Sequence, residues 1–299
     1  MSRIGPETWE DVFNSDGEPN LISDDLLMEM LKTEQSRSHS TNYRSSFSLW
    51  EMRTYRKLIE FIYRLIKVLK IDNAYVRYNT CDLYEQFLEK HIESTKSDRS
   101  ESSAVDDSNV RCEFRDRALL PLLTCIMLST KISSIHSIKN IDFYSLTINK
   151  KYGYEYSKET LIKSELNVMK TVGYKIDQCP LYSICPLLIL TLVYNEPSIN
   201  GKSLYEMLDK TLDYYYLAKA EIFTKLFDHL KESRKINDQD FKLFVGDSML
   251  ISCAIIVVTA ILVDEQSGPQ VLKELVYITC CGQKDIEIIK NAILEGISV

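Results

Sequence analysis

Hydrophobic residues recur at intervals of three and four along most of the chain, as they do on one face of an α-helix. The interval is clearest between residues 49 and 70, where lysine, arginine and glutamate fill the positions between the apolar ones. The apolar positions in this segment are Tyr55, Leu58, Ile59, Ile62, Leu65, Ile66 and Leu69. The pattern predicts a helix over 49–70 that buries one stripe and leaves a charged face in water.

The same interval predicts further helices, bounded by residues that commonly cap or end them. In the first part of the chain the predicted helices are 75–92, 114–131, 142–150, 158–172 and 181–194. In the remainder they are 204–216, 217–232, 240–263, 270–278 and 285–294. Ser157 is a favourable N-cap for the helix that follows it, and Gly173 stands where a helix C-terminus favours glycine. The pattern therefore predicts an all-α protein.

Composition and charge narrow the picture further. The chain of 299 residues holds 9 glycines and 7 prolines, few for the many turns of a β-sandwich or barrel. A net charge of −7 argues against holding nucleic acid by phosphate neutralisation, so no direct nucleic-acid binding is expected. The most apolar run, 248–263, is shorter than the about 20 residues that a membrane span needs. It predicts a buried core helix and no membrane partner.

Changes of composition also divide the chain into parts. Residues 1–48 are polar and acidic, and we expect a flexible N-terminal arm there. Residues 94–111 carry almost nothing apolar and predict a flexible surface insert within the first helical domain. The turn-rich segment Asn195–Gly201 predicts the boundary between two helical domains, 49–194 and 195–299.

A search for reactive groups gives a mostly negative result. The sequence shows neither a phosphate-binding glycine loop nor a zinc-type cysteine or histidine spacing, and its histidines are isolated. We therefore expect no enzyme activity, catalytic residue, metal, cofactor or small-molecule ligand. The cysteines are expected to be reduced thiols packed as small hydrophobes. They are Cys81, Cys112, Cys125, Cys179, Cys185, Cys253, Cys280 and Cys281.

Two charged residues stand at positions that the helical pattern predicts to be apolar. The predicted apolar stripe of helix 158–172 consists of Leu161, Ile162, Leu166, Met169 and Val172, and Glu165 lies within it, one turn after Leu161 and one turn before Met169. Lys131 continues the line of Leu123 and Met127 at the C-terminal end of helix 114–131, where the helix dipole favours a cation. Two alternatives stay open on spacing alone: the two side chains pair where the helices cross, or each reaches water separately.

The segments around these two residues resemble the cyclin box. A helix ending in IMLSTK is similar to the cyclin-box helix that ends in Ala-Ser-Lys, and KETLIKSELNVMKTVGYKI before Cys179-Pro180 resembles the glutamate-bearing helix of that family. YNTCDLYEQFL and DSMLISCAIIVVTAIL resemble further cyclin-box helices. The resemblance implies two tandem five-helix cyclin-box bundles, the second divergent. It also implies that Lys131 and Glu165 contact a cyclin-dependent kinase.

The polar insert and the third helix ending in Ser/Thr-Lys without the usual acidic pair are similar to a divergent branch of the cyclin family. That resemblance implies a nuclear, chromosome-associated protein that promotes maturation of meiotic crossovers at designated recombination sites. It would act in meiotic prophase by recruiting partners, among them a cyclin-dependent kinase and other crossover proteins. Two alternatives remain: a conventional regulatory cyclin that activates a cell-cycle or transcriptional kinase, and a DNA-binding protein built from cyclin-like repeats.

Overall fold

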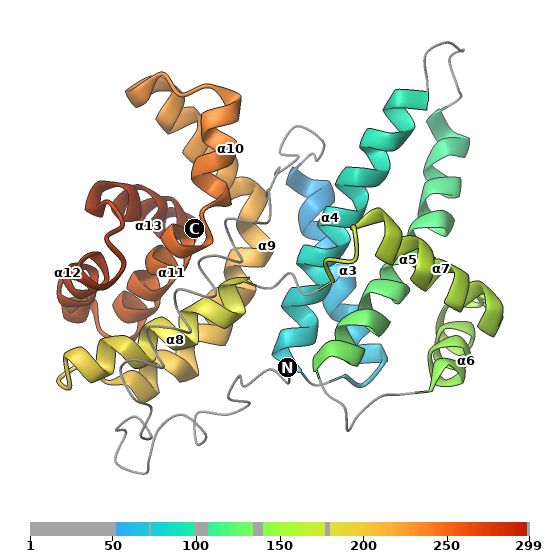
Figure 1. Ribbon diagram of the computed structural model, residues 1–299, viewed down its shortest axis with the longest axis horizontal. Coiled ribbons are helices and arrows are strands. Elements are labelled where there is room, and N and C mark those ends of the chain that lie inside the picture. The colour runs from blue at the N-terminus through green and yellow to red at the C-terminus, as the bar shows by residue number, and fades with distance from the viewer. Residues whose placement is uncertain (1–51, 72, 99–106, 134–139, 177–179, 298–299) are drawn as a thin grey trace. The chain divides into compact units, whose positions relative to one another are not determined.

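The computed structural model describes residues 52–71, 73–98, 107–133, 140–176 and 180–297. Within these ranges every regular element is a helix, which confirms the predicted all-α class (Figure 1). The helices are α3 (Met52–Val68), α4 (Ala74–Asp98), α5 (Asp107–Ser133), α6 (Ile141–Tyr152), α7 (Lys158–Thr171), α8 (Pro180–Asn195), α9 (Gly201–Arg234), α10 (Asp238–Gly246), α11 (Ser248–Val263), the short 3₁₀ helix η2 (Glu265–Ser267), α12 (Gly268–Thr279) and α13 (Gln283–Ile297). The predicted N-terminal arm, 1–48, lies outside the described residues.

The first compact unit spans Lys57–Cys179 and is organised around α5. Helices α4 and α7 both pack on α5, and every residue from 122 through 130 is buried. Polar residues in this run are satisfied internally, since the Thr130 hydroxyl donates to the Ile126 carbonyl at 2.8 Å. A helix buried all round is the expected centre of such a bundle.

Helix extends further into the polar segment 94–111 than its composition predicts. Helix α4 continues to Asp98 and α5 begins at Asp107, whereas the composition predicts a flexible insert over the whole segment. The segment contains neither glycine nor proline, and its polar residues can continue a helix that tertiary packing has already nucleated. A polar composition indicates that a segment faces water, but it does not by itself indicate where a helix ends.

The second compact unit comprises Pro180–Val299, which holds α8 to α13, together with the start of α3 up to Arg56. Its first helix, α8, packs on α9, α11 and α12, and so it lies in this unit and not in the preceding one. The division therefore falls one helix earlier than the predicted boundary at Asn195–Gly201. That turn-rich segment separates two helices of the same unit, because the apolar surface of α8 finds its partners after the turn.

Helix α9 is a single helix of 34 residues, whereas the sequence pattern predicts two helices, 204–216 and 217–232. Residues 202–234 include neither glycine nor proline, so nothing in the backbone chemistry requires a break in the helix. Tyr215 and Tyr216 at the predicted junction are buried and continue the packed stripe. The Asn200 side chain caps the start of the helix by accepting from the Ser203 N–H at 3.0 Å.

The predicted helix 240–263 is instead two helices, α10 and α11, which meet at a bend of 62°. Asp247 occupies the junction in an extended conformation, with φ −78° and ψ 96°. Its carboxylate accepts hydrogen bonds from the backbone N–H groups of Met249 at 3.0 Å and Leu250 at 3.1 Å. Asp247 is therefore the N-cap of α11, and the side-chain bonds replace backbone bonds that a continuous helix would have made.

Replacing Asp247 by alanine should lower the free energy of unfolding by about 1 kcal/mol, the usual cost of losing an N-cap. Asp247→Asn, which keeps a side-chain oxygen in place, should lose much less. Urea titrations followed by circular dichroism would measure both variants. Equal losses for alanine and asparagine would contradict the capping role.

Helix α11 is the most apolar helix of the second unit and lies at its centre. Its residues from 248 through 260 are all buried, and it packs on α8, α9, α12 and α13. In the described ranges no single helix is both long and apolar enough to cross a membrane, and one bent pair, α10 with α11, passes that test by length and composition alone. The structure thus agrees with the predicted core helix at 248–263.

Candidate functional site

Helix α7 carries one half of the predicted pair, and its two ends are fixed by local interactions. The Ser157 hydroxyl accepts the Thr160 N–H at 3.2 Å, as predicted for an N-cap. At the other end Gly173 adopts a left-handed conformation with φ +66°. Its N–H donates to the Lys170 carbonyl at 3.1 Å, and the Tyr174 N–H donates to the Met169 carbonyl at 2.7 Å. These two bonds form a Schellman motif, which uses the predicted glycine.

The face of α7 that packs inward differs from the predicted apolar stripe. Leu161, Val168 and Val172 are fully buried as helical spacing requires. Ile162 and Leu166, which were expected to join them, are 47% and 44% exposed. The apolar residues on α7 spread over a broad arc of its surface, and packing against α5, α4 and α6 decides which part of that arc is covered. The structure corrects the prediction and leaves an isoleucine and a leucine in water.

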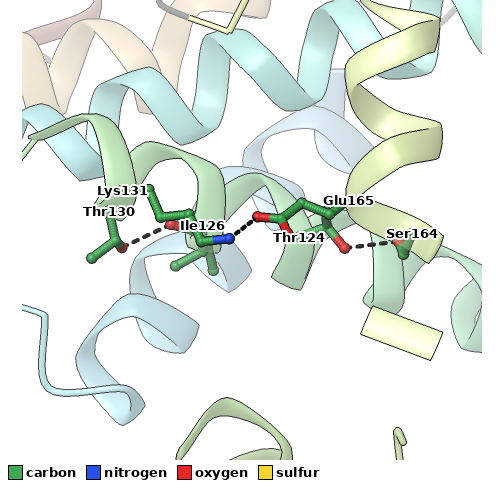
Figure 2. A network of polar contacts seen from close by, with 6 residues as sticks. All are labelled: Thr124, Ile126, Thr130, Lys131, Ser164 and Glu165. Atoms are coloured by element: carbon green, nitrogen blue, oxygen red, sulfur yellow. Dashed lines mark hydrogen bonds and ion pairs between the residues drawn. The ribbon is translucent and has the colours of Figure 1, made fainter. Parts of the chain in front are cut away.

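The structure brings Lys131 and Glu165 together (Figure 2). Lys131 extends from the last turn of α5, and its Nζ donates to Glu165 Oε1 on α7. The Glu165 side chain is 11% exposed and the Lys131 side chain is 37% exposed. Of the two open alternatives, the pairing of the two residues is therefore the one observed. A nearly buried carboxylate is compensated by a cation that still reaches the surface.

Neighbouring polar groups hold this crossing of α5 and α7 in register. One residue before Glu165, the Ser164 Oγ lies 2.7 Å from Thr124 Oγ1, and Thr124 donates to the Leu120 carbonyl at 2.8 Å. On α6, burial raises the pKa of Tyr144, and the nearby Glu165 carboxylate raises it further, while a hydrogen bond with Thr130 acts in the opposite direction. Tyr144 therefore stays a neutral phenol beside the pair.

Asn79 is a buried polar residue that supports the fold around the pair and was not predicted from the sequence. The side chain is fully buried on α4, and its Nδ2 donates to Ser129 Oγ at 2.9 Å and to the Ile176 carbonyl at 3.1 Å. It therefore ties the segment that leaves α7 to the α4–α5 core. A signal was present in the sequence, because Asn79 stands three residues after Val76 and four before Leu83, both fully buried.

The arrangement is suited to recognition of a protein surface. Glu165, which pairs with the partly exposed ammonium of Lys131, is on the same helix as the exposed side chains of Ile162 and Leu166. Apolar area with a fixed charge at its edge is the composition of a typical protein interface. Within the described ranges, no group of three or more His, Cys, Asp or Glu side chains is placed to hold a metal ion.

Comparison with known proteins identifies relatives for most of the chain. It is 23% identical over 247 residues to cyclin N-terminal domain-containing protein 1 of Mus musculus, covering 80% of this chain and 73% of that protein. It is 24% identical over 248 residues to the Homo sapiens protein of the same name, covering 80% and 74%. No protein-family model matches the chain. No solved structure matches it either.

These relatives share the same name, and the identity spreads over four fifths of the chain and does not stop at a single motif. The all-helical structure is consistent with a cyclin-like fold. The resemblance predicted from the residues is thus confirmed: the chain is similar to cyclin N-terminal domain-containing protein 1 over four fifths of its length.

Proposed function

We propose that this protein is a non-catalytic recruiting factor that promotes maturation of meiotic crossovers and binds a cyclin-dependent kinase through its first unit. It acts in the nucleus, on chromosomes in meiotic prophase, at designated recombination sites. The observation that carries the proposal is the Lys131–Glu165 pair, which occupies the two positions that the cyclin-box resemblance assigns to kinase contact.

The surroundings of the pair support a docking role over a purely internal one. A pair that served only stability would gain little from having its lysine 37% exposed, because solvent screens the attraction. Ile162 and Leu166, on the same helix as Glu165, expose apolar side chains that the protein's own core does not use. Exposed apolar side chains beside a directed charge supply affinity and orientation for a protein partner.

Acidic substitution of the exposed apolar residues should remove the partner. Ile162→Asp combined with Leu166→Asp places two carboxylates on the proposed kinase surface. We expect the amount of kinase recovered to fall by about tenfold or more. Co-purification of tagged full-length protein from meiotic cells, with thermal melts of the same preparations, would measure this. Leu243→Asp is the matched control, since Leu243 is 70% exposed on α10 of the other unit.

Three outcomes would count against the proposal. Equal kinase recovery from wild type and the double variant would remove the kinase contact at α7. Failure of a tagged copy to form chromosome-associated foci in meiotic prophase, with expression in all tissues, would instead favour a conventional regulatory cyclin. Reconstituted kinase activity with a purified partner would point the same way.

A further inference from the structure

Two cysteines, Cys280 and Cys281, form the turn between α12 and α13 in the second unit, and a third, Cys253, lies near this turn. Helix α12 ends at Thr279, and Cys280 then adopts a left-handed conformation with φ +58°, its N–H donating to the Val276 carbonyl at 3.0 Å. This reversal leaves Cys280 exposed and turns Cys281 inward to a half-buried position. Cys253, on the central helix α11, is fully buried.

The Thr279 hydroxyl brings Cys281 and Cys253 to the same point. Its Oγ1 lies 3.6 Å from Cys253 Sγ and accepts the Cys281 backbone N–H at 3.3 Å. Its own proton goes to the Leu275 carbonyl at 2.7 Å, which fixes the hydroxyl in place. The two thiols also lie close enough to influence each other's ionisation. Residues separated by almost thirty positions are thus held in side-chain contact by packing of α11 against α12 and α13.

The two thiols have different electrostatic surroundings. The neighbouring Cys253 thiol lowers the pKa of Cys281 to about 7, although burial, Asp247 and Asp285 act in the opposite direction. The Cys281 thiol, together with burial, raises the pKa of Cys253. A half-buried thiolate beside a protonated, buried thiol resembles the pairing of an attacking and a resolving cysteine in redox-sensitive sites.

We propose that Cys281 and Cys253 form a peroxide-sensitive dithiol that closes to an intramolecular disulfide. The Cys281 thiolate attacks one oxygen of a hydroperoxide, forming a sulfenic acid and releasing hydroxide or alkoxide. Cys253 then gives up its proton and attacks the sulfenic sulfur. The S–S bond forms, and the oxygen of the sulfenic acid takes up a proton and leaves as water. Two thiols lose two electrons and two protons in total, and the hydroperoxide is reduced.

The disulfide would join the α12–α13 turn covalently to the central helix of the second unit. Cys280, although adjacent and more exposed, lies on the outer side of the turn and takes no part. This site is independent of the Lys131–Glu165 pair, which is in the first unit, so kinase recovery and disulfide formation test separate statements.

Peptide mapping of the full-length protein after treatment with hydrogen peroxide would test the site. We expect a linked species that joins the tryptic peptide containing Cys253 to ELVYITCCGQK, with loss of about two daltons relative to the reduced pair. Because Cys280 and Cys281 share that peptide, Cys280→Ser resolves the assignment and should form the link as wild type does. Cys281→Ser should not form it.

Cys253→Ser should accumulate Cys281 sulfenic acid, detected with dimedone. Should the buried serine prevent folding, Cys281→Ser still decides the question, because its change lies in a half-buried turn. A link that persists in Cys281→Ser, or one that disappears in Cys280→Ser, would overturn the proposal. Oxidation of Cys280 ahead of Cys281 in the wild-type protein would overturn it as well.

Discussion

Replacing Glu165 by lysine should reduce kinase recovery by about tenfold or more while the chain stays folded. The substitution puts a second cation against Lys131 at a position where the carboxylate is only 11% exposed, and so it reverses the charge at the proposed docking surface. Lys131 is more accessible and can turn its ammonium group towards water, which limits the loss of stability to about 1–3 kcal/mol. Co-purification from meiotic cells and thermal melts of the same samples would measure both quantities.

The charge-swapped double variant separates docking from internal support. Lys131→Glu together with Glu165→Lys restores an opposite-charge pair within the protein, so stability should recover towards wild type. Its charges are exchanged relative to any partner, so kinase recovery should stay low. If the swap restored kinase recovery along with stability, the pair would be only a structural support, and the proposed contact would be refuted.

Truncating Ile255 to alanine should give the largest loss of stability of any single change discussed, about 2–5 kcal/mol. Ile255 is fully buried in α11, which packs on α8, α9, α12 and α13, so the lost methyl groups leave a cavity at the centre of the second unit. Denaturant titration followed by circular dichroism would show the shift in midpoint.

Leu262→Ala on the same helix is the matched control for Ile255→Ala. Leu262 is 39% exposed near the end of α11, and its truncation should cost only about 0.5 kcal/mol. Similar losses at the two positions would contradict the assignment of α11 as the central helix.

Local signals in the sequence were sufficient for most helices of the first unit. Ser157 and Gly173 act within one turn of the helix they delimit, so their side chain and backbone preference indicate the ends of α7 directly. The buried stripe of α3 follows equally from spacing, since Ile59, Ile62 and Leu65 are all fully buried. Where the signals were weaker, as at Asp247, the helix boundary was misplaced because an aspartate can equally lie on an exposed face.

The sequence by itself determined that the chain is helical, where α7 begins and ends, and that Lys131 and Glu165 stand at unusual positions. Each of these features depends on neighbours within a few positions. Only the tertiary structure decided that these two residues meet, that Ile162 and Leu166 remain exposed, and that α8 joins the second unit. Each of these depends on which apolar face contacts which distant helix. Helical periodicity shows that a residue shares a face with its neighbours, but the free energy of packing between whole helices selects the face that is covered.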